Sequence, residues 1–264
     1  MNLENLTEKV AELSRRVGQF IRHEGKNFDI SHIEHKGFND LVSYVDKQAE
    51  KMLVEGLREL LPEAGFIAEE GTGEGKKETY NWIIDPLDGT TNFLHGLPVF
   101  SISLALMKEQ ELVLGVVYEI NFDECFTAWK NGGAYLNGKR ISVSKPEKLS
   151  ASLIATGFPY HDFGLMQKYL QVLGSFMEKS HGVRRLGSAA VDLVYVACGR
   201  FEGFFEFNLN AWDVAGGTLI VKEAGGHVSK FTEDGDYVFG REIVASNGKI
   251  HSEMLDVIAK HWNL

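Results

Sequence analysis

Two aspartates stand three residues apart directly after a short apolar run of the chain. Asp85 and Asp88 belong to the segment DPLDGTTN, which follows the apolar residues 82–84. Carboxylate oxygens gathered in one place suit hard cations such as Mg²⁺. Pro86 fixes the backbone between the two aspartates. The pair is therefore a candidate for metal binding.

The residues that follow the second aspartate could hold a phosphate. Gly89 lets the backbone come close to a ligand, and the main-chain amides of Gly89 and Thr90 could bind phosphate oxygens. The same segment can also be an Asp-Pro and Asp-Gly turn without chemistry, because such turns are common. The segment alone leaves both interpretations open, so the position of other carboxylates matters.

Further carboxylates stand where folding could bring them to this pair. Glu69 and Glu70 close one apolar stretch, residues 65–68, just before a glycine-rich loop. Asp213 stands at the start of an expected helix that ends near Ala224, before two glycines. Aspartate is also a good N-cap residue, so Asp213 could be purely structural. The residues around Asp213 do not decide between a carboxylate that binds a ligand and a structural N-cap.

Asp46 lies on an expected helix that begins at Asn39 or Asp40 and continues to about Leu61. At about 100° per residue it falls within an apolar arc, formed by Val42, Val45, Ala49, Leu53 and Leu57. Aspartate is unfavourable in the middle of a helix, and on an apolar face it needs a hydrogen-bond partner. The residues alone allow a buried structural aspartate bonded to a hydroxyl or an amide.

The chain offers no convincing protein nucleophile for phosphate chemistry. Cys125 is followed by FTAWKN and lacks the arginine of a C-x₅-R cradle. The two aspartates are three residues apart, unlike the D-x-D of phosphatases that form an aspartyl phosphate. The glycine-rich segment 71–76 fits neither nucleotide-binding glycine motif and is interpreted as a flexible loop. Direct attack by metal-activated water is the simpler mechanism.

The elements that must position these residues mix helices and strands in both halves of the chain. The first helix is expected to end near Gly25, and strands are expected at residues 82–84, 99–107, 111–119 and 124–129. The second half begins around residues 144–150, and helices are expected there at 189–198 and 213–224. This pattern indicates a layered α/β (α+β) architecture in one unit.

Composition excludes several classes of protein. A chain of 264 residues with 44% hydrophobic content can bury a full core. Acidic residues outnumber basic ones by 37 to 27, which argues against non-specific nucleic-acid binding. The apolar run at residues 99–107 is too short to span a membrane, and the charged N-terminal segment is no signal peptide. Cys125 and Cys198 lack metal-ligand spacing and are expected as reduced thiols. We therefore expect a soluble, cytoplasmic protein without a membrane or nucleic-acid partner.

Two long segments resemble the signatures of the inositol monophosphatase family. They are WIIDPLDGTTNFLHGLP at residues 82–98 and NAWDVAGGTLIVKEAGG at residues 210–226. The pair Glu69-Glu70 stands where that family has a third acidic element. The resemblance extends over nearly the whole chain, including Lys36 and the expected helix at residues 40–53.

The resemblance implies a fold and a set of metal ligands. The fold is the layered αβαβα sandwich of this superfamily, spanning residues 1–264 as a single unit. Its subdomains are approximately residues 1–143 and 144–264, with the active site between them. Two or three Mg²⁺ ions are implied, and their ligands are Glu69, Asp85, Asp88, Asp213 and the main-chain carbonyl of Leu87.

The resemblance also implies roles for individual residues. Catalysis involves Glu69, and Asp46 pairs with Thr90 to orient the attacking water. The amides of Gly89 and Thr90 bind the phosphate. The residues implied to hold the substrate are Ala189, Glu206 and Asp213.

The implied activity is Mg²⁺-dependent hydrolysis of myo-inositol monophosphate, with inhibition by Li⁺ and a homodimeric protein. One alternative is a related phosphatase that acts on fructose 1,6-bisphosphate, histidinol phosphate or 3′-phosphoadenosine 5′-phosphate. Another alternative is a non-catalytic regulatory or binding protein on the same fold. Retention of four mutually repelling carboxylates speaks against this last alternative.

Overall fold

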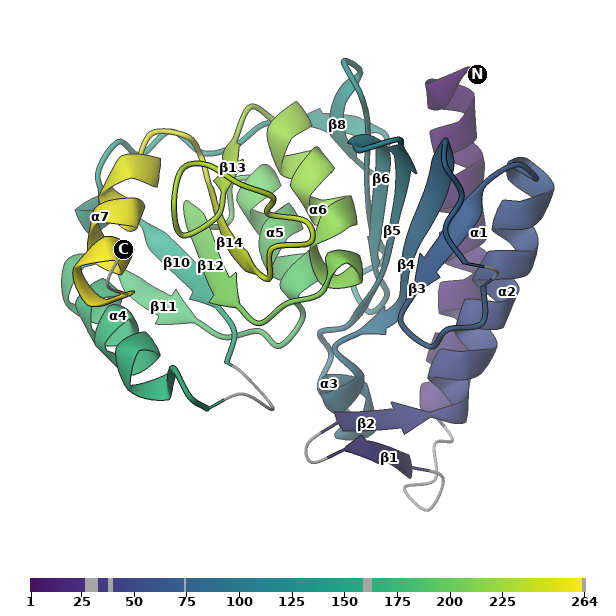
Figure 1. The fold of residues 1–264 in the computed structure, drawn as a ribbon, viewed down its shortest axis with the longest axis horizontal. Helices are drawn as coiled ribbons and strands as arrows, with labels where there is room; N and C mark the ends of the chain where they lie inside the picture. The colour runs from purple at the N-terminus through teal and green to yellow at the C-terminus, as the bar shows by residue number, and fades with distance from the viewer. Residues whose placement is uncertain (27–32, 38–39, 74, 159–162, 263–264) are drawn as a thin grey trace.

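Two β-sheets and three helical layers alternate across the molecule (Figure 1). The computed structural model describes all residues except 27–32, 38–39, 74, 159–162 and 263–264. One pair of helices covers the outer face of each sheet, and a third pair lies between the sheets. The αβαβα order that the family resemblance implies is thus confirmed.

Among the described residues, the first sheet has seven strands, ordered as they follow along the chain. They are β3 (Gly65–Ala68), β4 (Tyr80–Asp88), β5 (Ser101–Lys108), β6 (Glu111–Glu119), β7 (Glu124–Trp129), β8 (Gly133–Leu136) and β9 (Lys139–Ile141). Only β3 and β4 are parallel neighbours. Helices α1 (Leu3–Gly25) and α2 (Tyr44–Leu60) cover one face through fully buried side chains such as Val17 and Leu53.

The second sheet has five described strands in the order β11-β10-β12-β14-β13. Their bounds are β10 (Leu153–Thr156), β11 (Gly182–Arg184), β12 (Gly203–Phe207), β13 (His227–Ser229) and β14 (Glu242–Ser246). Helices α4 (Met166–Lys179) and α7 (His251–Trp262) form the outer layer on this sheet. Smaller elements are the hairpin β1 (Ile33–Gly37) and β2 (Asp40–Ser43), helix α3 (Thr90–Leu94) and the 3₁₀ turn η2 (Leu149–Ala151).

Helices α5 (Ala189–Ala197) and α6 (Ala211–Glu223) lie between the sheets and are apolar around most of their circumference, as a doubly covered helix requires. Two adjacent glycines let α6 approach its neighbours closely. A Cβ atom on Gly216 would lie 2.9 Å from the carbonyl oxygen of Leu104 in β5. A Cβ atom on Gly217 would lie 2.6 Å from Cβ of Leu193 in α5. Gly216 therefore sets how near α6 comes to the first sheet, and Gly217 sets how near it comes to α5.

The expected start of the second helix is wrong. Asp40 belongs to strand β2, Asn39 lies outside the described residues, and α2 begins at Tyr44. Ser43 is the N-cap, because its hydroxyl accepts the N–H of Val45 at 3.1 Å. Asp46 is consequently the third residue of the helix rather than a mid-helix residue.

Asp213 is likewise not the N-cap of its helix. The helix begins at Ala211, two residues earlier than expected, and Asn210 is the N-cap. The carboxylate of Asp213 accepts the N–H of Asn210 at 2.6 Å. The other expected elements occur with ends shifted by a few residues. In the described part of the chain, no helix is both long and apolar enough to cross a membrane.

Candidate active site

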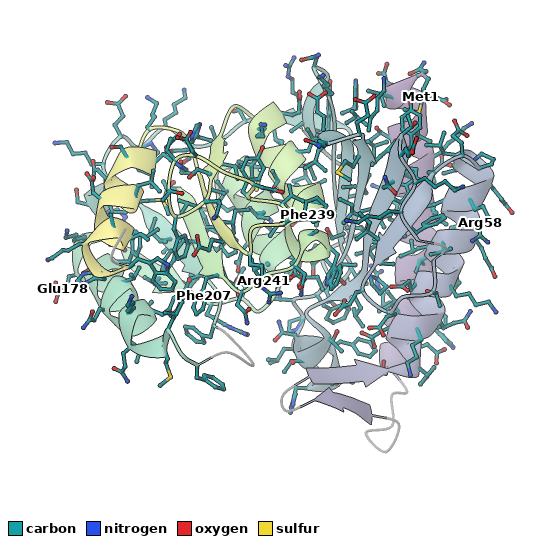
Figure 2. All side chains as sticks on the ribbon, in the orientation of Figure 1. Met1, Arg58, Glu178, Phe207, Phe239 and Arg241 are labelled. Atoms are coloured by element: carbon teal, nitrogen blue, oxygen red, sulfur yellow. The ribbon has the colours of Figure 1, made fainter. Side chains whose placement is uncertain are left out.

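A pocket of about 420 Å³ opens between the two sheets, and both halves of the chain contribute to its wall. From the first half come Glu69, Asp85, Leu87, Asp88, Gly89 and Thr90. From the second half come Gly157, Arg185, Ala189, Asp192, Glu206, Phe207, Asp213 and Arg241. Phe207 and Arg241 are labelled in Figure 2, which locates this region.

Three carboxylates from two separate elements converge in this pocket. Asp85 and Asp88 lie in the last part of β4, and Asp213 lies in the first turn of α6. One oxygen from each carboxylate lies within 4.8 Å of the others. Glu69, just after β3, also lines the pocket and is near enough to raise the pKa of Asp85. All these donors are oxygens, as a hard divalent cation requires.

The electrostatics of the cluster favour a bound cation. Burial raises the pKa of Asp85 well above its ordinary value, and the charges of Glu69, Asp88 and Asp213 raise it further. Burial also raises the pKa of Asp88 to about 6 and, together with the charge of Asp88, that of Asp213 to about 7. Ionised carboxylates this close repel one another, and a divalent cation reverses that cost.

Hydrogen bonds from the start of α5 fix the orientation of the Asp88 carboxylate. Its Oδ2 atom accepts the hydroxyl of Ser188 at 2.6 Å and the N–H of Ala190 at 2.7 Å. Ser188 is the N-cap of α5, so the carboxylate lies at the positive end of that helix. The sequence gives no local signal for this contact, since the partners are about a hundred residues apart.

Gly89 is required by the backbone at the beginning of α3. Its φ angle is +95°, which side chains rarely tolerate. A Cβ atom there would lie 3.0 Å from the carbonyl oxygen of Val99 and 3.1 Å from that of Gly187. The glycine therefore allows the chain to turn sharply from β4 into α3, directly after Asp88.

Asp46 in α2 contacts Thr90 at the start of α3. The hydroxyl of Thr90 lies 2.9 Å from Asp46 Oδ1 and 3.0 Å from the carbonyl oxygen of Leu87. The other oxygen of Asp46 accepts the N–H of Ser43 at 2.9 Å and its hydroxyl at 2.6 Å. Asp46 is thus a structural capping residue and a partner of Thr90 at the same time.

Glu50 was not singled out by sequence reasoning, although it holds the acidic loop in place. Its side chain is fully buried, and it accepts the N–H of Glu70 at 2.7 Å and that of Thr72 at 2.8 Å. Glu70 thus contacts Glu50 through its main chain and is not among the pocket residues. A usable signal existed, because Glu50 lies one helical turn after Asp46 on the same face.

Further charged side chains line the pocket besides the carboxylate cluster. Glu206 on β12 is 7% exposed, and burial together with the charge of Asp213 raises its pKa well above the ordinary value. Ala189, at the start of α5, lies in the same pocket wall. Arg185, Asp192 and Arg241, which sequence reasoning did not assign, contribute further charge.

Known proteins resemble this chain over nearly its whole length. Residues 2–263 match the model of the inositol monophosphatase family. The chain is 45% identical over 249 residues to a putative Nus factor SuhB of Neisseria meningitidis serogroup B, covering 94% of this chain and 95% of the relative. It is 39% identical over 256 residues to an inositol-1-monophosphatase of Mesorhizobium japonicum, covering 97% and 96%. A solved IMPase structure from Thermotoga maritima superposes with a TM-score of 0.87 at 38% identity, covering 96% of each chain. The chain therefore belongs to the inositol monophosphatase family.

Proposed function

We propose that the protein is a Mg²⁺-dependent phosphomonoester hydrolase whose preferred substrate is myo-inositol monophosphate. The observation that carries this proposal is the convergence of Asp85, Asp88 and Asp213 beside the Asp46–Thr90 contact. The test is phosphate release from a panel of phosphomonoesters at fixed Mg²⁺. The panel contains inositol 1-phosphate, fructose 1,6-bisphosphate, histidinol phosphate and 3′-phosphoadenosine 5′-phosphate. If the protein hydrolysed none of the four esters, the proposal would be contradicted.

The pocket residues fit the proposed metal. Two or three Mg²⁺ ions would be held by Glu69, Asp85, Asp88, Asp213 and the carbonyl oxygen of Leu87. When bound, magnesium supplies positive charge that polarises phosphoryl oxygens and makes a nearby water more acidic. The amides of Gly89 and Thr90 would bind the phosphate at the start of α3.

The protein's own residues would orient the attacking water and take its proton. A hydroxyl has one proton, so Thr90 can donate it to Asp46 while its oxygen accepts a hydrogen bond from water. Burial raises the pKa of Asp46, which makes this carboxylate a better proton acceptor than an exposed one. Ser43 holds Asp46 in place through two hydrogen bonds. Glu69, in the same pocket, would help to orient the water.

Replacement of Asp213 by asparagine should leave a folded protein with little activity. The amide oxygen of Asp213→Asn can still accept the N–H of Asn210, but a negative charge on the metal is lost. We expect kcat to fall by about a hundredfold or more, the scale of losing a key electrostatic group. The matched control is Asp256→Asn, an exposed aspartate on the outer helix α7. Near-normal activity of Asp213→Asn at saturating Mg²⁺ would show that Asp213 has only a structural role.

Replacement of Glu206 by glutamine should affect substrates unequally. The carboxylate is proposed to accept hydrogen bonds from substrate hydroxyls, together with Ala189 and Asp213. A lost hydrogen bond to a charged group corresponds to a loss of about tenfold to a hundredfold. We expect Glu206→Gln to lower kcat/KM for inositol 1-phosphate more than for p-nitrophenyl phosphate. Glu178→Gln, on the outer surface of α4, is the control (Figure 2). Equal losses on both substrates would show that Glu206 does not recognise the polyol.

A second candidate function is regulatory. The Neisseria meningitidis relative is named a putative Nus factor, so a similar role that does not depend on turnover is the alternative we retain. The cluster of repelling carboxylates favours catalysis, because a scaffold without bound metal gains nothing from it. Mg²⁺-dependent turnover by the purified protein separates the two candidates.

We also propose three properties that the family resemblance implies. The chain has two subdomains, residues 1–143 and 144–264, it forms a homodimer, and Li⁺ inhibits it.

Helix α4 offers an apolar surface for a second copy. Met166, Leu170 and Met177 are 38%, 48% and 63% exposed and recur at helical spacing on one face. Sedimentation as a monomer at micromolar concentration would contradict the dimer.

A further inference from the structure

Asp192 is a buried carboxyl that the proposed mechanism does not use. It lies in the first turn of α5, is 1% exposed and lines the active-site pocket. In the described part of the chain, no hydrogen-bond donor reaches its Oδ1 atom. A buried polar atom without a partner costs free energy, and natural proteins keep few such groups. A ligand that enters the pocket is the natural partner for this carboxyl.

The charges around Asp192 come from three pocket residues. Burial raises the pKa of Asp192 well above its ordinary value, and the charges of Glu206 and Asp88 raise it further. The guanidinium of Arg185 acts in the opposite direction. The charge of Glu206 on β12 thus acts on Asp192 on α5, although the two residues come from different elements.

The wall around these two carboxyls is closely built. A Cβ atom on Gly157 would lie 2.0 Å from Glu206 Oε1, so only glycine at this position leaves room for the carboxyl. The guanidinium carbon of Arg185 lies 5.6 Å from the ring centre of Phe158, which restricts the position of this cation. Gly157, Phe158 and Arg185 all line the same pocket as Asp192 and Glu206.

We infer that Asp192 is a second residue, besides Glu206, that binds hydroxyl groups of the substrate. This inference rests on the proposed phosphatase function and adds a specificity residue to it. A hydroxyl both donates and accepts a hydrogen bond, so it satisfies a carboxyl in either protonation state. A phosphate ester without hydroxyls leaves the Oδ1 atom of Asp192 without a partner.

The test compares two substrates that share a six-membered ring and differ in hydroxyl groups. They are inositol 1-phosphate and cyclohexyl phosphate, each assayed with wild type, Asp192→Asn and Asp192→Leu. We expect Asp192→Leu to raise KM for inositol 1-phosphate about tenfold more than KM for cyclohexyl phosphate, with a much smaller effect on kcat, as the loss of one hydrogen bond predicts. Asp192→Asn keeps an amide oxygen and should show a smaller difference. Asp256→Asn serves as the surface control.

Two results would overturn the inference. Equal losses on both substrates would show that Asp192 only balances the charge of Arg185, and an unchanged KM for inositol 1-phosphate would show no contact. Circular dichroism checks the fold, and Asp192→Asn carries the comparison if Asp192→Leu does not fold. If wild type releases no phosphate from either ester, the proposed function fails separately. Calorimetric binding of inositol 1-phosphate to wild type and Asp192→Asn, with Mg²⁺ present, then decides the role of Asp192.

Discussion

Removal of divalent cations should abolish phosphate release, and added Mg²⁺ should restore it. Asp85 is buried, Asp88 and Asp213 are half-buried, and the three carboxylates lie close together. Without a cation, desolvation raises all three pKa values, and repulsion by neighbouring carboxylates further raises those of Asp85 and Asp213. In that state the pocket lacks the divalent cation that would polarise the phosphoryl oxygens and make a nearby water more acidic. The measurement is phosphate release after chelation with EDTA, after gel filtration, and after readdition of Mg²⁺.

The same carboxylates predict how the metal requirement changes with pH. Protons compete with Mg²⁺ for Asp88 and Asp213, whose pKa values are about 6 and about 7 before the metal binds. Lowering the pH from about 8 to about 6 should therefore raise the Mg²⁺ concentration needed for half-maximal activity. Circular dichroism of the chelated protein is the control for unfolding. Full turnover in thoroughly demetallated protein would exclude the proposed mechanism.

Removal of either Thr90 or Asp46 should lower kcat by about 10²–10⁴-fold, the usual contribution of general base catalysis. The two side chains lie 2.9 Å apart, and Asp46 is 2% exposed. Thr90→Ala and Asp46→Asn should leave substrate affinity nearly unchanged, because neither residue is proposed to hold the substrate's hydroxyls. Thr90→Ser keeps the hydroxyl and is the matched variant that should retain most activity.

The double variant decides whether the pair acts as a unit. Groups that work together are non-additive, so Thr90→Ala with Asp46→Asn should be scarcely slower than the slower single variant. The four kcat values are measured at saturating Mg²⁺, and thermal unfolding reports any loss of the α2 cap. Losses that multiply would mean that the two residues act independently. Asp46 would then keep only its capping role toward Ser43.

Local sequence was sufficient for much of this protein. The apolar run before Asp85 and the expected first helix that ends near Gly25 each predicted an element that the structure contains. These signals are local, since the side-chain periods of helices and strands follow directly from backbone geometry. The acidic pair and its glycine also pointed to oxygen ligands and phosphate on residue type alone.

Helix starts were less well predicted, because several neighbouring residues suit the same cap. Asn39, Asp40 and Ser43 are all good N-cap residues, and pairing of β2 with β1 excluded Asp40. The same ambiguity moved the cap of α6 from Asp213 to Asn210. Strand pairing depends on distant residues, so the choice among caps cannot be read from the local sequence.

Tertiary structure alone decided which carboxylates meet and which are buried. Asp213 reaches Asp85 and Asp88 because Gly216 lets α6 lie against β5, a contact between distant parts of the chain. Glu50 and Asp192 look like ordinary charged residues of helices in the sequence, yet both are buried. The cost of burying a carboxyl depends on the donors and charges that surround it after folding, and those come from other elements. For this reason the sequence indicated the metal chemistry, whereas only the folded chain showed that Asp192 lines the pocket and that Glu50 holds the acidic loop.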